Sequence, residues 1–449
     1  MAKRKAIKGP HLVRYGIAGD QKFLVGDLLG TYDELVINAR MVAHMAAGLA
    51  LFLTQRAHNK PHFIDPETHI FQHDFDYLLS TNQEGEARLK RSVDRLKEWY
   101  GNPIGEVIKK EQRIIPDDFN EPRERHDFCQ RVIDFQLNAI NERVQESENI
   151  EYYKFLEEKG VVKSSSFAPT LVVAPYFCMD GNTFDDWIDI NIKCAKDSKK
   201  IASERNIPMA IEIVVTQSVL FDPKKVKSLI EKYTEIEPAV FLIWVDAFSE
   251  HEVSEGLLNS FVTMLKELKA SGSQVVNLYG SYFSVMLLHR GILDGVTHGL
   301  EYGEERPLVP VGGGIPTAKF YLPTLHLRLK REDAIRAVRA LRGFKSVEDF
   351  HKFVCDCQQC KEAISNAQED FGGYLRTKRV NTRDIPYPET KENSVRHYMF
   401  AKQREYADKN IDKALGRLRE ARRQLRKYIG AENTDHCEKW ASVISGLVK

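Results

Sequence analysis

Five apolar stretches recur between residues 170 and 300: TLVVAPYFCMD (170–180), MAIEIVVTQSV (209–219), AVFLIWVDAF (239–248), QVVNLYG (274–280) and ILDGVTHGL (292–300). Each is typical of a β-strand, and an earlier stretch, PHFIDPETHIF (61–71), predicts a short strand followed by a turn. Amphipathic helical patterns separate the five strands, near residues 184–205, 222–234, 255–270 and 281–290. Strands that alternate with helices at this spacing predict a parallel sheet with helices on its faces.

Two architectures fit this alternation, the doubly wound sheet and the (β/α)8 barrel. The first turn after a strand lacks the G-x-G-x-x-G pattern of dinucleotide-binding doubly wound sheets. Polar residues instead recur at the predicted carboxyl ends of the strands, namely Asp65, Asp180, Gln217, Asp246, Asn277 and Asp294. A helix cap accounts for any one of them, but a barrel builds its active site at this end of its strands. The six together favour an α/β fold of the TIM-barrel type.

Three cysteines in the string CDCQQC, Cys355, Cys357 and Cys360, are followed by His397. Cysteines this close in the chain cannot form a disulfide framework among themselves, but they can bind one ion through soft sulfur ligands. With the histidine they make a closed Cys3His set, which predicts a structural Zn²⁺ site. The alternative is a reactive or accidental cysteine cluster. A long, charged segment separates Cys360 from His397.

A basic helical run closes the chain. From Arg396 to Tyr428 the sequence predicts one long helix, and its last part is rich in cations. Such a surface can neutralise phosphates, although a solvated helix face would show the same pattern equally well. The residues that would contact nucleic acid are Arg417, Arg419, Arg422, Arg423, Arg426 and Lys427.

The organisation that follows is a barrel over residues 1–345, with a charged insertion near 82–123, and a zinc-binding subdomain with basic C-terminal helices over 346–449. With 43% hydrophobic and 29% charged residues, the chain has ample material for a core. Its odd number of cysteines, seven, and their clustering favour a reducing, cytoplasmic compartment. The apolar segment Val36–Leu53 contains Asn38, Arg40 and His44, so we expect a buried helix and no membrane span.

A parallel barrel followed by C-x-C-x2-C and a later histidine resembles the tRNA-guanine transglycosylase superfamily, over about residues 63–406. The resemblance implies a general acid/base or pocket carboxylate at Asp65, and contacts from Asp180 and Gln217 to the guanine base. It implies a nucleophilic aspartate on the penultimate strand. Asp294 is the nearest carboxylate there, with Asp246 and Glu301 in reserve.

Stringent motifs of the RNA-modifying enzymes are absent, so the chain is most similar to the divergent branch that inserts 7-deazaguanine derivatives into DNA. That likeness implies exchange of guanine for a cyano-deazaguanine precursor through a covalent aspartyl-glycosyl intermediate. It also implies DNA as the partner, a flipped-out target base and a 7-deazaguanine base as co-substrate. A homodimer and partner proteins of a DNA modification system are further expectations.

Three alternatives stay open. The first is a tRNA-guanine transglycosylase that acts on RNA. The second is a metal-dependent barrel hydrolase, which His62, His69 and His73 suggest. The third is a non-catalytic nucleic-acid-binding protein on a degenerate barrel, for which Asp65 and Asp294 would be dispensable.

Overall fold

The computed structural model describes residues 5–57, 60–81, 85–145, 150–160, 167–301, 303–309, 317–381 and 383–447. Eight of its strands form one sheet in which every hydrogen-bonded pair is parallel. In chain order they are β1 (His11–Tyr15), β2 (Glu34–Asn38), β3 (His62–Asp65), β6 (Val172–Val173), β7 (Met209–Val215), β8 (Val240–Val245), β9 (Gln274–Asn277) and β10 (Gly295–His298). Long β-branched and aromatic runs such as VFLIWV in β8 suit a sheet that is buried on both faces.

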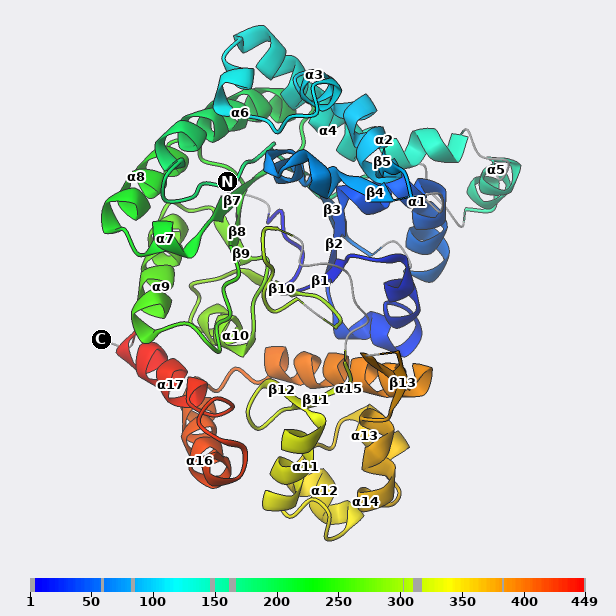
Figure 1. The fold of residues 1–449 in the computed structure, drawn as a ribbon, viewed down its shortest axis with the longest axis vertical. Helices are drawn as coiled ribbons and strands as arrows, with labels where there is room; N and C mark the ends of the chain where they lie inside the picture. The colour runs from blue at the N-terminus through cyan, green and yellow to red at the C-terminus, as the bar shows by residue number, and fades with distance from the viewer. Residues whose placement is uncertain are drawn as a thin grey trace.

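The sheet curls into a nearly closed barrel (Figure 1). Its strand order is β3-β2-β1-β10-β9-β8-β7-β6, which brings the last strand beside the first. The backbone N–H of Thr170, just before β6, donates to the carbonyl of His62 in β3 over 2.8 Å, so the two edge strands also meet. The predicted α/β fold with a barrel-like parallel sheet is therefore confirmed.

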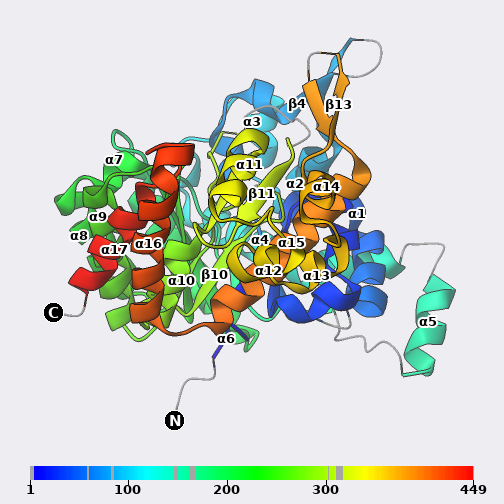
Figure 2. The same cartoon turned by 90° about the horizontal axis from the view of Figure 1, so that it is seen from below.

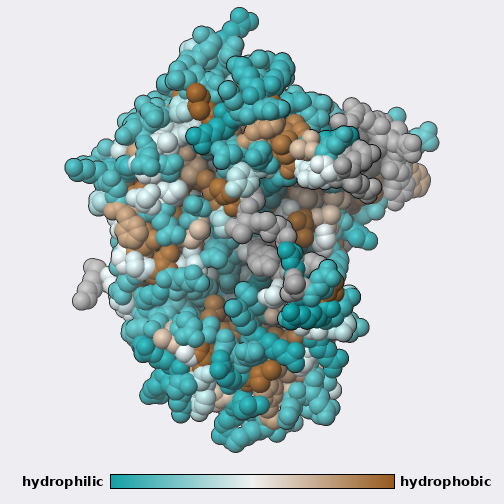
Figure 3. Space-filling view, viewed as in Figure 1, coloured by the Kyte–Doolittle hydropathy of each residue, from teal (hydrophilic) through white to brown (hydrophobic). Residues whose placement is uncertain are grey.

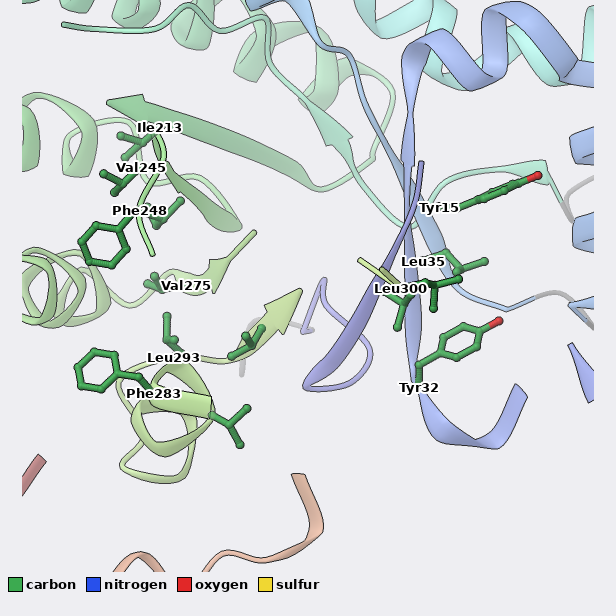
Figure 4. Packing of buried hydrophobic residues seen from close by; sticks show 14 of the residues in the cluster. Tyr15, Tyr32, Leu35, Ile213, Val245, Phe248, Val275, Phe283, Leu293 and Leu300 are labelled. Carbon is green, nitrogen blue, oxygen red and sulfur yellow. The ribbon is translucent and has the colours of Figure 1, made fainter. Parts of the chain in front are cut away.

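Two separate hydrophobic clusters show which side chains point into the barrel. The smaller cluster fills the interior and includes Leu12, Val36, Phe63, Val214 and Trp244. The larger cluster lies between the sheet and the surrounding elements. Figure 4 shows part of it, with Ile213, Val245 and Val275 on one side of the barrel and Tyr15 and Leu35 on another. Because side chains alternate along a strand, the polar residues two positions from interior residues also point inward.

Helices surround the sheet (Figure 1). They are α1 (Ala39–Leu51), α4 (Pro122–Gln145), α6 (Phe184–Glu204), α8 (Pro223–Thr234), α9 (Glu255–Ala270) and α10 (Tyr282–His289), with the short α7 (Gln217–Leu220) after β7. Capping residues define two of their starts: Asp222 accepts from the backbone N–H groups of Lys224 and Lys225 at α8, and Ser254 accepts from Leu257 at α9. No helix in the described ranges is both long enough and apolar enough to cross a membrane.

The segment between β3 and β6 leaves the barrel and returns. It contains a two-stranded hairpin, β4 (Leu79–Thr81) and β5 (Ala87–Leu89), followed by α2 (Arg91–Tyr100) and α3 (Ile104–Lys109). The chain then re-enters the ring of helices through α4, and α5 (Ile150–Glu158) follows. Most of the charged stretch predicted as an insertion, residues 82–123, falls within this excursion.

The C-terminal region packs against the outside of the barrel (Figure 1). Its strands form two hairpins, β11 (Lys319–Leu322) with β12 (Leu327–Lys330), and β13 (Thr377–Val380) with β14 (Arg383–Pro386). Its helices are α11 (Arg331–Ala340), α12 (Val347–Phe353), α13 (Gln358–Ala363), α14 (Ala367–Asp370), α15 (Pro388–Ala407), α16 (Ile411–Ile429) and α17 (His436–Gly446). On α15, the Tyr406 ring stacks on His11 of β1 at 4.0 Å between centroids, which joins this region to the sheet.

Two predicted helices have different limits in the structure. The helix expected over Val36–Leu53 begins at Ala39, because Val36 and Asn38 belong to β2. The single helix expected over residues 396–428 is broken into α15 and α16. The break follows a local cap: the side chain of Asn410 accepts from the backbone N–H of Lys413 and starts a new helix.

Candidate active site and metal centre

Asp65 lies at the centre of a buried polar cluster at the carboxyl end of the sheet, which we call the barrel mouth. It is the last residue of β3 and points inward, two positions after Phe63. One carboxylate oxygen accepts from Arg14 Nη1 of β1 over 2.9 Å. The other accepts from the Tyr176 hydroxyl at 2.6 Å and from the backbone N–H of Glu67 at 2.9 Å. Asp65 is therefore a fully engaged carboxylate that fixes several elements of the mouth.

Glu67 forms a second charged centre beside Asp65. Its backbone is left-handed, with φ of 49°, and its side chain is fully buried. Arg40 donates from Nη2 at 2.8 Å and from Nε at 3.1 Å, and Arg306 donates at 3.2 Å. Burial opposes the charge of Glu67, but the arginines outweigh burial and hold the pKa of its carboxyl group well below the usual value. Glu67 is thus a buried anion that binds the side chains of Arg40 and Arg306.

Arg306 reaches over the aromatic side chains of the mouth from the segment after β10. Its guanidinium lies 5.1 Å from the Trp244 ring centre and donates to the Tyr279 hydroxyl over 2.7 Å. Arg14 lies over the other part of this cluster, 4.6 Å from the Tyr279 ring centre. These contacts place planar cations and aromatic faces together, an arrangement suited to holding a flat polar ligand.

His69 completes the cluster as a neutral ring. Its Nδ1 lies 3.0 Å from the Tyr176 hydroxyl. Since that hydroxyl donates to Asp65, its oxygen accepts from His69 Nδ1–H, which leaves Nε2 as a lone pair with no partner among the described residues. Burial lowers the pKa of His69 well below its ordinary value. The mouth therefore offers one unprotonated nitrogen, His69 Nε2, that has no hydrogen-bond partner among the described residues.

Glu212 lies inside the barrel on β7, between the interior residues Ala210 and Val214. It is buried, and neither carboxylate oxygen has a hydrogen-bond partner of ordinary geometry among the described residues. Burial, reinforced by the charge of Asp65, raises the pKa of Glu212 well above its usual value. The two carboxyl groups are thus in opposite environments, since Asp65 is paired with a cation while burial raises the pKa of Glu212 and favours its protonated form. Such a split is typical of acid–base sites.

Glu212→Gln is expected to stabilise the protein by an amount that grows as the pH rises above the ordinary pKa of a glutamate. Above the ordinary value of 4.5, unfolded Glu212 loses its proton while folded Glu212 keeps it, so wild-type stability falls as pH rises. The fall is at most about 1.4 kcal/mol per pH unit for one proton. Denaturant unfolding should give a larger free energy of unfolding for Glu212→Gln than for wild type, and this difference should grow between about pH 5 and pH 8.

The exposed Glu235, at the end of α8, provides the matched control. Glu235→Gln should change stability by less than about 0.5 kcal/mol across the same range. A Glu212→Gln variant that is less stable than wild type by the same amount at every pH would show that Glu212 is ionised in the folded protein.

Three other predicted residues, Asp180, Gln217 and Asp246, lie near the ends of the strands where they were expected. Asp180 follows a parallel bridge between Met179 and Val215, and its Oδ1 accepts from the backbone N–H groups of Asn182 and Thr183 at 2.7 and 3.0 Å. It therefore caps the turn that leads into α6. Gln217 donates to the carbonyl of Ala247 over 2.9 Å, which joins the rims of β7 and β8.

Asp246 directly follows β8 and is half-buried. Its backbone N–H donates to Val215 over 2.8 Å, and its Oδ1 accepts from the backbone N–H of Leu308 over 2.6 Å. No ion pair to Asp246 is formed by a described residue. Asp246 is therefore a positioned carboxylate at the mouth to which no described cation is bound.

Asp294 lies at the opposite end of the sheet, so its predicted place at a carboxyl end is wrong. It precedes β10, and its carboxylate accepts from Lys269 Nζ at 2.5 and 2.7 Å and from the backbone N–H of Val275 at 2.8 Å. Both partners lie at the amino ends of strands or the end of α9. The apolar run ILDGVTHGL does not show where the strand begins, because Ile292 and Leu293 are apolar but lie outside β10.

Glu301, the other reserve, lies after β10 and points to the C-terminal region. Its carboxylate pairs with Lys391 of α15 at 2.6 Å. Asn277, the remaining polar strand end, is buried at the end of β9 and donates to Glu250 over 3.1 Å and to Ser284 over 2.8 Å. Both residues are engaged in holding neighbouring elements.

The metal centre brings together Cys355, Cys357, Cys360 and His397, all of them buried. Their ligand atoms all lie within 4.8 Å of one another, and His397 Nδ1 is 3.8, 3.3 and 3.4 Å from the three sulfurs in that order. A tetrahedral ion with ordinary Zn–S and Zn–N bonds would separate sulfur from nitrogen by about 3.6 Å. The four side chains therefore fit a closed tetrahedral metal site.

Surrounding groups orient these ligands. His397 Nε2 lies 2.6 Å from the Tyr321 carbonyl, which can only accept, so Nε2 carries the proton and Nδ1 is free for a metal. The Tyr374 hydroxyl donates to Cys360 Sγ, and the backbone N–H groups of Cys357 and Cys360 lie 3.4 Å from the sulfurs of Cys355 and Cys357. Donors of this kind stabilise thiolates. Among the described residues, no other group of three possible ligands gathers in this way, which gives no support to a catalytic metal at His62, His69 and His73.

The predicted basic surface of α16 is largely neutralised within the protein. Ion pairs link Arg417 to Asp408, Arg423 to Glu420, and both Arg422 and Arg426 to Asp435. Arg419 donates to Ser445 of α17 over 3.4 Å, and Lys427 lies over the Tyr428 ring. Four of the six predicted residues are thus paired with carboxylates of the same chain.

No protein-family model matches the sequence, and no curated protein is similar to it. The resemblance drawn from CDCQQC and His397 is thus a hypothesis about function. Its support must come from the chemistry of the barrel mouth and the metal centre.

Several residues of the mouth have weak signals in the sequence. Arg14 belongs to β1, a strand that was not predicted, and Arg306 follows β10 in an irregular segment. Glu212 is the exception, because a single carboxylate within the apolar run MAIEIVV is a detectable anomaly.

Proposed function

We propose that this protein exchanges guanine in DNA for a 7-deazaguanine derivative, as the resemblance to the tRNA-guanine transglycosylase superfamily implies. The observation that carries the proposal is the contrast between two carboxyl groups: Asp246, at the barrel mouth, has no cation bound to it by a described residue, and Glu212, buried inside the barrel, has a raised pKa. Base exchange with retention needs a nucleophile for the sugar and a group that manages the proton of the leaving base.

In this mechanism Asp246 takes the role that the sequence assigned first to Asp294. Its carboxylate attacks C1′ of the nucleotide, the bond from C1′ to the base breaks, and guanine leaves with a proton that Glu212 supplies. The incoming 7-deazaguanine then attacks C1′, displaces Asp246 and returns a proton to Glu212. Atoms and protons balance over the cycle.

The other residues of the mouth would bind and position the base. Asp65 is saturated by three donors and so acts as a pocket carboxylate that holds Arg14 and Tyr176 in place. Trp244, Tyr279 and Arg306 offer flat surfaces on which a flipped-out base can stack. Asp180 and Gln217 lie on the adjoining rim and are proposed to contact the base edge.

The metal centre is proposed to hold one structural Zn²⁺. Three thiolates and one imidazole form a donor set that Zn²⁺ prefers, and the four ligands leave no position for a substrate. The ion would organise the C-terminal region and would take no part in the exchange.

Base exchange is tested by incubating the full chain with duplex DNA or with tRNA, each carrying labelled guanine, and with the cyano-deazaguanine base. We expect label to leave DNA and the deazaguanine nucleoside to appear when that DNA is digested and analysed by mass spectrometry. Release from tRNA alone would favour the RNA-acting alternative. No release from either polymer would favour the non-catalytic, nucleic-acid-binding alternative.

A further inference from the structure

The β13–β14 hairpin is an exposed ribbon with an unusual charge. In its paired strands, Lys378 lies opposite Ile385, Arg379 opposite Asp384, and Val380 opposite Arg383. Most of its described side chains are exposed, including Val380 near the tip at 39%. The ribbon therefore presents most of its described side chains to solvent.

Cations dominate the ribbon and its approach. Arg376, Lys378, Arg379 and Arg383 lie within eight positions, and Asp384 is the one carboxylate among residues 376–384. None of the four cations forms an ion pair with a described residue, whereas four of the six α16 cations do, namely Arg417, Arg422, Arg423 and Arg426. Since no described residue forms an ion pair with them, the four side chains are available to bind an anion.

The base of the ribbon is fixed at the rim of the barrel. Pro386, the last residue of β14, lines a small cavity of about 40 Å³ together with Leu300 and Glu301, which follow β10. Lys391, at the start of α15, pairs with Glu301 over 2.6 Å. The ribbon is thus anchored beside the carboxyl end of β10, within reach of a polymer that presents a base to the mouth.

Figures 2 and 3 show on which side of the molecule the ribbon lies. In Figure 2 the segment that leads to the N-terminus lies at the bottom, and the hairpins marked β4 and β13 both project at the top. Figure 3 shows strongly hydrophilic side chains over the place where Figure 1 labels β13, on the face that looks down on the barrel.

We propose that the β13–β14 ribbon binds duplex DNA by entering its major groove beside the target base. The inference rests on the proposed function for the choice of a nucleic acid. The major groove of B-form DNA admits a two-stranded ribbon, and four available cations can neutralise the phosphates on both sides of it. The major groove of A-form RNA is too narrow for the same contact, so the ribbon selects DNA over duplex RNA.

The test measures binding of the full chain to a fluorescent DNA duplex of about 30 base pairs as the salt concentration is raised. The ribbon variant is Lys378→Ala/Arg379→Ala/Arg383→Ala. A matched variant removes three exposed lysines from the outer surface of α6, Lys193→Ala/Lys196→Ala/Lys200→Ala. A third variant removes three exposed cations from α16, Arg419→Ala/Arg423→Ala/Lys427→Ala.

The ribbon variant should weaken DNA binding by about tenfold or more, and should reduce the slope of log affinity against log salt by about 2 to 3, since each lost phosphate contact removes about 0.9. The α6 and α16 variants should stay within about twofold of wild type. Unchanged binding by the ribbon variant, or a larger loss from the α16 variant, would overturn the proposal. Wild-type binding to duplex RNA as tight as to DNA would also overturn it, because groove entry would then not account for the affinity.

Binding and base exchange are separate readouts in these experiments. If wild type binds DNA through the ribbon but exchanges no base, the ribbon proposal stands and the proposed function fails. If bases are exchanged while the ribbon variant binds and reacts like wild type, the proposed function stands and the ribbon proposal fails.

Discussion

Replacement of Asp246 by asparagine is expected to lower the rate of guanine release from DNA by about a thousandfold or more, the scale of loss when a positioned catalytic group is removed. The substitution is structurally mild. Asparagine keeps the side-chain oxygen that accepts from the backbone N–H of Leu308 at 2.6 Å, so the rim of β8 should retain its conformation. Only the negative charge needed for attack on C1′ is lost. Single-turnover release of labelled guanine measures this step directly.

Asp294→Asn is the matched control for this prediction. Asp294 was the first nucleophile assigned from sequence, yet it pairs with Lys269 at the far end of the sheet. Asp294→Asn should therefore release guanine at nearly the wild-type rate, with stability reduced by no more than about 1 kcal/mol because the pair is partly exposed. Loss of release in Asp294→Asn but not in Asp246→Asn would refute the assignment of roles.

Asp65→Asn separates a structural role from a catalytic one. Arg14 is buried and would lose the negative charge that compensates it, so the variant is expected to lose about 3–5 kcal/mol of stability. Asp246→Asn leaves no described buried cation unpaired and should unfold at nearly the wild-type denaturant concentration. Asp65 and Asp246 are thus distinguished by the stability of their variants as well as by the rate of guanine release.

Cys357→Ala is expected to remove the metal and to unfold the C-terminal region at much lower denaturant concentration than wild type. The sulfur of Cys357 is a proposed metal ligand, and it also accepts from the backbone N–H of Cys360 at the start of α13. Structural Zn²⁺ is worth about 10–16 kcal/mol in small zinc domains, so loss of one ligand should cost several kcal/mol here. Metal analysis should give one ion per wild-type chain and almost none in the variant.

Cys437→Ala is the control for the metal prediction. Cys437 is also buried, but it lies on α17 and is not among the four ligands. The variant should retain one ion per chain and show only the modest stability change of a small core substitution. A metal content that is unaffected by Cys357→Ala would mean that the ion is bound elsewhere, as the hydrolase alternative requires.

The candidate metal ligands were the most predictable part of the site. The string CDCQQC contains both the type of ligand and the spacing. Three cysteines this close together in a chain are typical of a site for a soft metal ion. His397 is far from the cysteines in sequence. The fold brings it to them, because α15 returns to the cluster and the Tyr321 carbonyl fixes the ring with Nδ1 toward the sulfurs.

The helices and strands from residue 170 onward were also largely predictable. Periodicity gave α6, α8, α9 and α10 nearly to the residue, since their apolar faces repeat at helical spacing. The first two strands were missed because β1 carries His11 and Arg14, and β2 runs directly into α1 with no turn between them. Local patterns fail where a strand is short and its polar side chains are neutralised by distant residues.

By itself the sequence determined a parallel, helix-covered sheet and a Cys3His set, because both are encoded by residues close together in the chain. Only the tertiary structure decided which carboxylates share the barrel mouth. Asp65 accepts hydrogen bonds from Arg14 and Tyr176, and its charge helps to raise the pKa of Glu212, while Asp294 falls at the opposite end of the sheet. The end of a strand at which a side chain lies depends on where pairing with its neighbours begins, and no local pattern fixes that register.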